Sequence, residues 1–449
     1  MKNTLLIHFV CVIFAASFTT INAQSMSHTL SAPVAKKLPK QLKKHNEIRI
    51  DDYYWLNDRE NPEVIDYLNQ ENSYYDAMTA HTKDFQKQLF EEMKGRIKED
   101  DQSVPYLYNG YYYITRYEKG QDYPIYSRKK GSLDAPEEIL FNCNELAKGH
   151  TFFQLGGLSV SPDNRFASFG VDTVGRRIYT IKIKNLETNE ILPDVIENAT
   201  GGSVWANDNH TLFYTRQDKV TLRANQIFKH KLQTSADQDI LVFEEKDETF
   251  NCFVYKTKSS AFIMIGSGQT LSTEYQFLDA NNPSGEFKIL QARERNHEYS
   301  IDHFEGSFYI VTNWEAKNFR LMKTSVENTQ KENWEEVIPH REDVLLEGID
   351  IFSNYYVVSE RKAGLNELRI INWKDNSEHY IEFNDPTYTA GSHANPEFNT
   401  ELFRYSYSSL TTPYSVYDFN MNNHSQKLLK QQEVLDENFK TFERLLGGL

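Results

Sequence analysis

Cysteine is scarce in this chain of 449 residues, which contains only Cys11, Cys143 and Cys252. Cys11 lies in an N-terminal apolar run that we expect to be removed by processing. The remaining two cysteines do not make a disulfide framework, and the sequence leaves open whether Cys143 and Cys252 pair. The stability of the folded chain must therefore come mainly from packing.

Basic residues are outnumbered by acidic ones, 49 to 64, which gives a formal net charge of −15. An acidic surface repels phosphates, so the composition argues against a nucleic-acid partner. It also fits attraction of basic peptides, although a solvated acidic surface is the simpler interpretation.

Long apolar runs are absent, and the longest N-terminal one, Leu5–Ala16, is too short to span a membrane. Lys2 precedes this run and Ile21–Ala23 follows it, as expected for a secretory signal that is cleaved before Gln24. The sequence therefore predicts a signal peptide over residues 1–23 and export to the periplasm or the medium.

The G-x-S-x-G elbow of α/β-hydrolases, which exposes a nucleophilic serine on a strained turn, is also missing. Gly157–Ser161 and Gly201–Trp205 both lack the final glycine. Gly266–Gly268 begins like a dinucleotide-binding loop, but Leu271 stands where the third glycine belongs. These segments are interpreted as strands and turns.

The one candidate metal-binding motif is also incomplete. His297-Glu298 resembles the start of a zinc-protease motif, but Ile301 replaces the second histidine and the next one is His303. The acidic pairs Glu244-Glu245 and Asp247-Glu248 are interpreted as solvated charge. The sequence thus assigns no catalytic residue, no metal ligand and no cofactor-binding residue, and it implies no cofactor.

An N-terminal extension is predicted over residues 24–105. Its first part, up to about residue 48, is rich in lysine and is expected to be a mobile, solvated arm. A helix should start at Pro62 with Asn61 as its cap, and a second helix should start near Lys83. Both helices are amphipathic and need a surface to cover their apolar sides. The residues that form these sides are Val64, Leu68, Tyr75 and Met78 in the first helix and Phe85, Leu89, Met93 and Ile97 in the second.

From about Tyr106 the pattern changes to seven apolar, aromatic-rich runs, each followed by a polar turn and a second run. The first runs end near Thr115, Gly170, Thr215, Ile265, Thr312, Ser359 and Ser406. The last four recur at intervals of about 47 residues, within the range of a four-stranded propeller blade. The sequence therefore predicts an all-β fold, a seven-bladed β-propeller over residues 106–435.

The C-terminal segment does not complete a domain. Leu428–Leu435 is expected to form a closing strand, whereas residues 436–449 form neither a domain nor a polar cap. We interpret residues 436–449 as a truncated hinge or tail where a further domain would begin.

Several stretches of the sequence resemble those of a known protein family. The matching stretches are Asp51–Pro62, Leu158–Asp163, Asp172–Arg177, His340–Gly348 and Arg404–Pro413. Together they resemble the N-terminal portion of the oligopeptidase B group of the prolyl oligopeptidase family of serine peptidases. The resemblance extends over residues 33 to 435.

The resemblance implies a propeller that sits as a lid over an α/β-hydrolase domain and admits peptides that are cut after Lys or Arg. It also implies that the catalytic Ser, Asp and His belong to a C-terminal domain that this chain lacks, so the chain alone is expected to be inactive. Two alternatives stay open: a free-standing binding module or regulatory subunit, and assembly with a separately encoded hydrolase domain.

Overall fold

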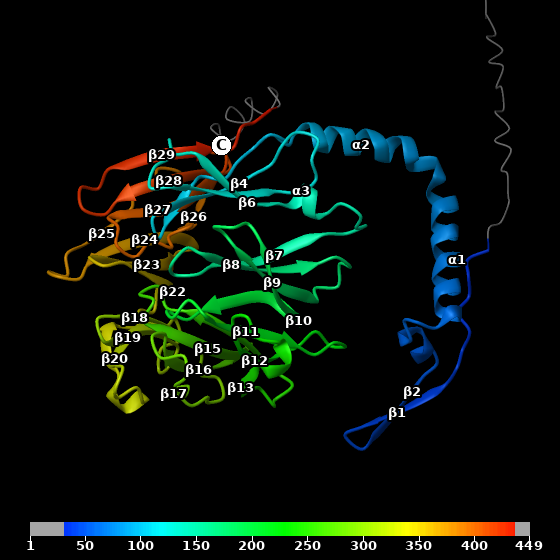
Figure 1. Cartoon of the computed structure of the whole chain (residues 1–449), viewed down its shortest axis with the longest axis horizontal. Helices are drawn as coiled ribbons and strands as arrows, with labels where there is room; N and C mark the ends of the chain where they lie inside the picture. The colour runs from blue at the N-terminus through cyan, green and yellow to red at the C-terminus, as the bar shows by residue number, and fades with distance from the viewer. Residues whose placement is uncertain (1–30, 436–449) are drawn as a thin grey trace, which may run out of the picture. The chain divides into compact units, whose positions relative to one another are not determined.

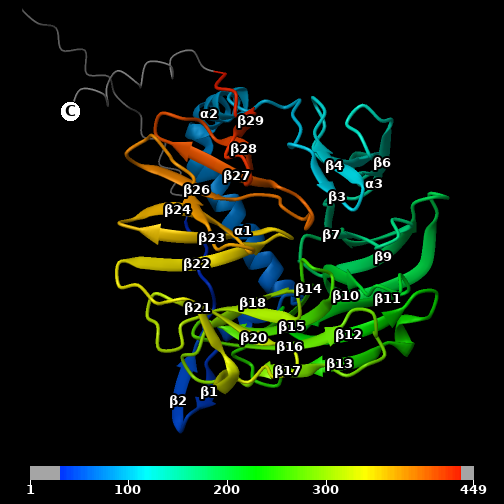
Figure 2. The ribbon, with the colours of Figure 1, turned by 90° about the vertical axis from the view of Figure 1, so that its left-hand side faces the viewer.

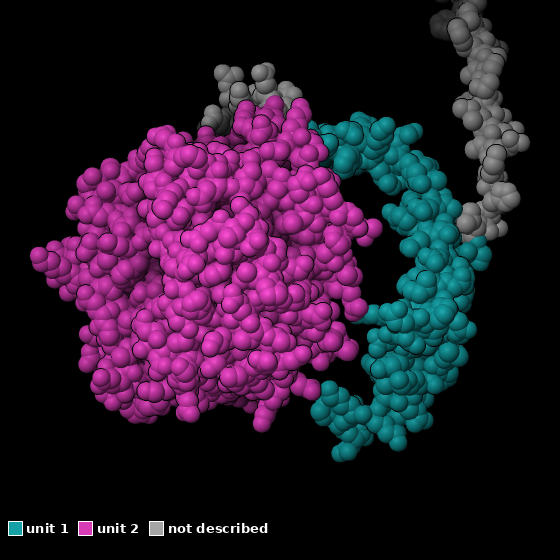
Figure 3. Space-filling view, in the orientation of Figure 1, with its two compact units in different colours: residues 1–95 teal, residues 96–449 magenta. Residues whose placement is uncertain are grey.

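The computed structural model describes residues 31–435, which belong to two compact units divided between Gly95 and Arg96 (Figure 3). The expected signal peptide and the segment 436–449 lie outside the described residues. No helix of the described part is long and apolar enough to cross a membrane.

The first unit contains a β-hairpin and two helices (Figure 1). The hairpin consists of β1 (Lys40–Lys44) and β2 (Glu47–Asp51), which pair antiparallel. A 3₁₀ turn follows at Tyr54–Asn57, then α1 (Pro62–Thr79), a second 3₁₀ turn at Ala80–Thr82, and α2 (Lys83–Gly95). The Asn61 side chain accepts a hydrogen bond from the Glu63 amide at 3.0 Å, which confirms the predicted cap.

The hairpin was not predicted, because a mobile arm was expected there. His45 and Asn46 take positive φ values of 52° and 64° at its two-residue turn, as a tight hairpin turn requires. The segment also contacts the residues that follow the hairpin. Lys40 lies 3.7 Å from the centre of the Tyr54 ring, and Trp55 Nε1 donates to the Lys36 carbonyl at 2.9 Å.

Both helices expose the apolar sides that the sequence predicted. Val64 is the one buried residue of α1, and α2 has none. The exposed large apolar residues are Ile65, Leu68, Tyr75 and Met78 in α1 and Phe85, Leu89, Phe90 and Met93 in α2. The first unit therefore does not bury these side chains itself.

The second unit is a β-propeller whose sheets follow one another around a ring in chain order (Figure 2). Five sheets have four antiparallel strands each. The first contains β3 (Tyr106–Tyr108), β4 (Tyr111–Arg116), β5 (Ile125–Lys130) and β6 (Glu137–Asn142), and a short helix α3 (Cys143–Leu146) follows it.

The other four four-stranded sheets lie in the C-terminal part of the unit. One is formed by β14 (Asn251–Lys256), β15 (Phe262–Gln269), β16 (Ser272–Asp279) and β17 (Lys288–Gln291). The next is formed by β18 (Tyr299–Phe304), β19 (Ser307–Thr312), β20 (Arg320–Ser325) and β21 (Glu335–Ile338). Then come β22 (Val344–Ile351), β23 (Tyr355–Lys362), β24 (Leu365–Asn372) and β25 (Glu378–Tyr380). The last consists of β26 (Tyr388–Ser392), β27 (Leu402–Ser409), β28 (Ser415–Asn420) and β29 (Gln426–Gln431).

The prediction of seven separate blades is wrong, because there are five four-stranded blades and one continuous seven-stranded sheet. The seven strands are β7 (Gln154–Val160), β8 (Phe166–Asp172), β9 (Tyr179–Asn185), β10 (Ile191–Trp205), β11 (Thr211–Gln217), β12 (Ala224–Lys231) and β13 (Ile240–Glu244). β10 has 15 residues, and it pairs with β9 through Ile191–Ala199 and with β11 through Ala199–Trp205. The single strand β10 thus belongs to two sets of strands that were expected to form separate blades.

Glycines allow β10 to pass close to its neighbours at this junction. Gly201 has φ of 97°, and a Cβ at Gly170 would lie 2.6 Å from the Gly201 Cα. Only glycines fit such an approach without strain. The seven predicted runs themselves are all strands, namely β4, β8, β11, β15, β19, β23 and β27.

The core lies between consecutive sheets. Phe308 of β19 is fully buried and contacts Phe262 and Phe277 of the preceding sheet at ring-centre distances of 5.2 and 5.0 Å. Phe352 and Phe403 pack in the same way between the last two sheets, 6.2 Å apart. Each sheet therefore covers the apolar face of the next, as a radial array requires.

The first and last four-stranded sheets share no strand in the part of the chain that the structure describes. Polar contacts link the two instead. Arg404 Nη1 donates to the Pro105 carbonyl at 2.7 Å, and Lys430 Nζ contacts Asp101 Oδ2 at 2.6 Å.

His230 on β12 joins the two halves of the seven-stranded sheet. Its Nε2 lies 2.9 Å from Asp194 Oδ1, on β10, and its Nδ1 lies 2.7 Å from Asp239 Oδ1. The His230 side chain is fully buried. Burial alone would lower the pKa of His230, but the hydrogen bonds to the two carboxylates raise it to about 9. The imidazole is therefore a buried cation at neutral pH.

This network predicts a pH-dependent stability. Because the folded-state pKa of His230 exceeds its unfolded value, the stabilisation is complete below pH 6.5 and is lost as the pH rises through about 9. The expected loss is about 3 kcal/mol, since each pKa unit corresponds to about 1.4 kcal/mol. Urea unfolding between pH 6 and 10 should show this loss in the wild type and not in His230→Asn. An equal pH dependence in both proteins would exclude the network as its cause.

Candidate functional site

A cavity of about 450 Å³ opens where the first strands of several sheets converge. It is lined by Tyr108, Tyr255, Lys256, Thr257, Lys258, Ser260, Ser300, Ile301, Asp302, Gly348, Ile349 and Pro396. These residues come from the sheets that begin with β3, β14, β18, β22 and β26, or from the turns after these strands. The cavity therefore lies at the centre of the ring, in the size range of ligand pockets.

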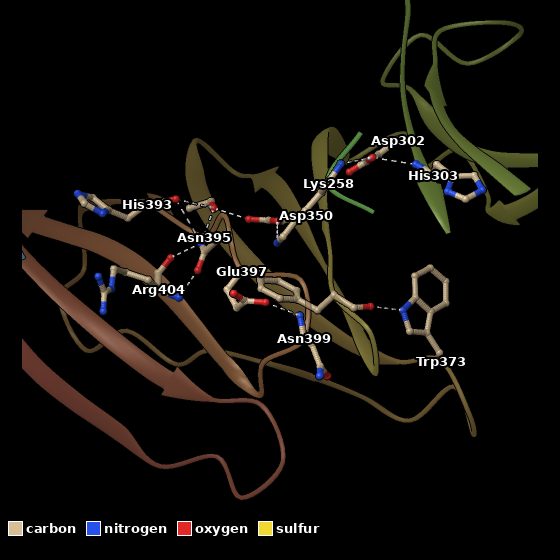
Figure 4. Close-up of polar contacts among 12 residues, drawn as sticks. Lys258, Asp302, His303, Asp350, Trp373, His393, Asn395, Glu397, Asn399 and Arg404 are labelled. Atoms are coloured by element: carbon tan, nitrogen blue, oxygen red, sulfur yellow. Dashed lines mark hydrogen bonds and ion pairs between the residues drawn. The ribbon is translucent and has the colours of Figure 1, made fainter. Parts of the chain in front are cut away.

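Lys258, in the turn after β14, crosses this region to a sheet that is not its neighbour (Figure 4). Its Nζ lies 2.6 Å from Asp350 Oδ1 on β22, so the ion pair passes over the intervening strand β18. The same ammonium group lies 3.4 Å from the centre of the Phe352 ring. Ser392 Oγ, at the end of β26, donates to Asp350 Oδ2 at 2.8 Å. The pair thereby links three sheets.

Asp302 on β18 is the second carboxylate of the site. Its Oδ1 accepts hydrogen bonds from the His303 amide at 2.8 Å and the Lys258 amide at 3.4 Å. Burial raises the pKa of Asp302 to about 6 in spite of these bonds. Burial also lowers the pKa of Lys258, against the attraction of Asp350. The charges of this site are thus incompletely solvated.

Glu397 adds a third carboxylate from the loop after β26. It accepts from the Asn399 amide and from the Asn109 amide, each at 3.3 Å. Asn395 fixes the start of this loop, because its side chain accepts from the Arg404 amide at 2.7 Å and donates to the Arg404 carbonyl at 2.8 Å.

Ser259 and His303 lie 2.9 Å apart beside the cavity, which invites comparison with a nucleophile and its base. The Gly306 amide donates to Nε2 of His303, so the neutral ring carries its proton on Nδ1 and donates it to Ser259 Oγ. Burial lowers the pKa of His303, which favours this neutral form. A base must accept the hydroxyl proton, so the orientation is the reverse of an activated serine.

The glycine-containing motifs singled out in the sequence lie in strands or begin within one. Gly157–Ser161 starts within β7, Gly201–Trp205 ends β10, and Gly266–Gly268 lies in β15. His297 Nε2 contacts Thr312 Oγ1 at 2.9 Å. Among residues 31–435 no three His, Cys, Asp or Glu side chains are grouped so that they could hold a metal ion.

The interpretation of the two acidic pairs as solvated charge is wrong for Glu245. Glu245 is buried rather than solvated, and its Oε2 lies 2.5 Å from Arg293 Nη2 and also accepts a hydrogen bond from Ser267. The other three acids of the two pairs are exposed as predicted. Cys143 and Cys252, whose pairing the sequence left open, are both buried and free.

Lys258, Asp302, Asp350 and Glu397 were not singled out from the sequence. They are spaced 44, 48 and 47 residues apart, close to the repeat length. Asp302 and Asp350 lie near the ends of β18 and β22, whereas Lys258 and Glu397 lie in the segments that follow β14 and β26. A search for charged residues that recur with this period would have found them.

The ring of antiparallel sheets around a lined cavity defines a β-propeller. The sequence matches the family described as "Prolyl oligopeptidase, N-terminal beta-propeller domain" over residues 33–432. The chain belongs to this family.

Relatives extend the comparison. The chain is 38% identical to dipeptidyl aminopeptidase BI of Pseudoxanthomonas mexicana and 30% identical to protease 2 of Moraxella lacunata; the alignments cover 97% and 91% of this chain and 62% and 59% of the relatives. Oligopeptidase B of Leishmania major has a similar structure, with a TM-score of 0.83, 29% identity, and coverage of 90% of this chain and 61% of that protein. The chain thus spans about three fifths of the length of these relatives.

Proposed function

We propose that this chain is the propeller and N-terminal extension of a serine peptidase, and that it filters the peptides reaching an α/β-hydrolase portion. The structural likeness to oligopeptidase B over 90% of this chain carries the proposal. The central cavity supports it, because the first strands of the sheets surround a space of side-chain dimensions. In this proposal, the chain without a hydrolase portion does not cleave peptides.

The proposed substrates are short peptides with basic residues that are cleaved after Lys or Arg, as in the oligopeptidase B group. The 38% identical relative is named a dipeptidyl aminopeptidase, which favours a second candidate, release of dipeptides from free N-termini. Two reporters separate these candidates when the hydrolase portion is present. One has a blocked amino group and Arg before the cleaved bond, and the other is a dipeptide reporter with a free amine. Export through the predicted signal peptide remains part of the proposal.

The exposed sides of α1 and α2 are proposed to be covered by the hydrolase portion, encoded with this chain or separately. Until they are covered, Phe85, Leu89 and Met93 should bind an environment-sensitive dye such as ANS. We expect Phe85→Ser/Leu89→Ser/Met93→Ser to reduce the dye emission by about half or more, because large apolar patches are rare on unpartnered surfaces. The propeller should melt at an unchanged temperature, since these residues are not in its core.

A free-standing binding module makes the opposite prediction for this dye experiment. Such a protein would have no reason to keep these side chains uncovered in solution. Its wild-type form would therefore give no dye emission above that of the triple variant, and this result would contradict the proposed hydrolase contact.

A further inference from the structure

We propose that Asp350, which follows the cavity-lining residues Gly348 and Ile349, binds the cationic side chain of an oligopeptide, and that Lys258 occupies this site as an internal substitute in the unliganded chain. The inference rests on the proposed function in one respect, namely that peptides reach the cavity. It adds a specific binding site for a lysine or arginine side chain within the propeller.

The contacts of the Lys258 ammonium group show how this site binds a cation. Asp350 Oδ1 binds the Lys258 ammonium group at 2.6 Å, and the Phe352 ring lies beneath that group at 3.4 Å. A carboxylate beside an aromatic face is a strong arrangement for recognition of ammonium and guanidinium groups. Ser392 donates to the other oxygen of Asp350 and so fixes the orientation of the carboxylate.

The negative charge around Asp350 favours binding of a cationic ligand. Three carboxylates, those of Asp350, Asp302 and Glu397, attract the single ammonium group of Lys258. The other cation of the lining, Lys256, donates its hydrogen bond to Asn207 and so is bound elsewhere. Burial lowers the pKa of Lys256 to about 8, which weakens its repulsion of a ligand near that pH.

A ligand can displace the Lys258 ammonium group from Asp350 without disrupting a sheet. Lys258 belongs to the turn after β14, and its ammonium group reaches Asp350 on the flexible side-chain stem. Lys258 lines the cavity, and the side chains of Lys258 and Asp350 are 12% and 21% exposed, so neither group is sealed from a ligand. An incoming guanidinium has an advantage over Lys258, because its planar fork presents several donors to a carboxylate.

The test compares Lys258→Met with Lys323→Met in the full chain. Lys323 forms an exposed pair with Glu335 on another part of the surface, so both variants lose one positive charge. The probe is fluorescein-labelled Gly-Arg-Gly with a blocked C-terminus, and its analogue carries uncharged citrulline in place of arginine. Lys258→Met should bind the arginine probe about fivefold to tenfold more tightly than the wild type, because Asp350 is released from its internal partner. Lys323→Met should bind like the wild type, and citrulline should remove the gain.

Equal affinities of Lys258→Met and Lys323→Met for the arginine probe would overturn the proposal, as would an equal gain with citrulline. Should Lys258→Met fail to melt cooperatively, Asp302→Asn provides the second test in an otherwise intact site. It should weaken arginine binding about threefold relative to Glu335→Gln, because one buried carboxylate is neutralised; no difference from Glu335→Gln would overturn the proposal. These assays measure no hydrolysis, so their failure is distinct from failure of the proposed peptidase role.

Discussion

Replacement of Glu360 by glutamine should lower the free energy of unfolding by about 3–5 kcal/mol, because removal of one partner of a buried ionic network leaves an uncompensated charge. Glu360 lies on β23 and its side chain is fully buried. Its carboxylate accepts from Arg369 Nη2 at 2.5 Å, from Tyr380 at 3.1 Å and from Arg341. The neutral amide introduced by Glu360→Gln would place N–H donors against the guanidinium groups of Arg369 and Arg341, whose side chains are 9% and 30% exposed.

The measurement is urea unfolding at pH 7, with Glu335→Gln as the matched control. Glu335 is 74% exposed and pairs with Lys323, so its loss should change stability by less than about 0.5 kcal/mol. Similar losses in the two variants would show that the Glu360 network does not stabilise the β22–β25 sheet.

Phe308→Ala is expected to cost about 3–5 kcal/mol, because truncation of a buried aromatic residue removes apolar contacts and leaves a cavity. Phe308 has no exposed surface and contacts Phe262, Phe277 and His303 across two sheets. The loss should appear as a lower midpoint of denaturant unfolding with an unchanged slope, which is the signature of a change in stability alone.

Leu410→Ala serves as the comparison for Phe308→Ala, since the Leu410 side chain is 79% exposed. It should leave the midpoint almost unchanged. A loss at Phe308 no larger than at Leu410 would contradict the packing of consecutive sheets against one another.

Local patterns predicted the elements of the fold well. Asn61 and Pro62 marked the start of α1 because a cap and a fixed φ act locally. The seven apolar runs became strands because alternation and aromatic content favour a half-buried sheet. The continuous strand β10 was not predicted. It depends on close contact between Gly201 and Gly170, which are distant in sequence, and no local pattern reports this contact.

The candidate site was harder to predict, because each of its residues is ordinary in its own segment. Lys258 lies in a polar turn, and Asp302 lies in an alternating strand at a position of the less buried face, where a polar residue is ordinary. Their significance arises only when the ring brings successive repeats together around one cavity. The burial of Glu245 was missed for the same reason, since its partner Arg293 is 48 residues away.

In the proposed function, this chain filters the substrates of a serine peptidase and the hydrolase portion cleaves them. The most direct measurement is hydrolysis of a blocked Arg reporter by the purified chain, with and without a serine-directed phosphonate, and again after addition of the hydrolase portion of the 38% identical relative. We expect no turnover by the chain alone. Turnover by the pure chain that the phosphonate abolishes would contradict this expectation.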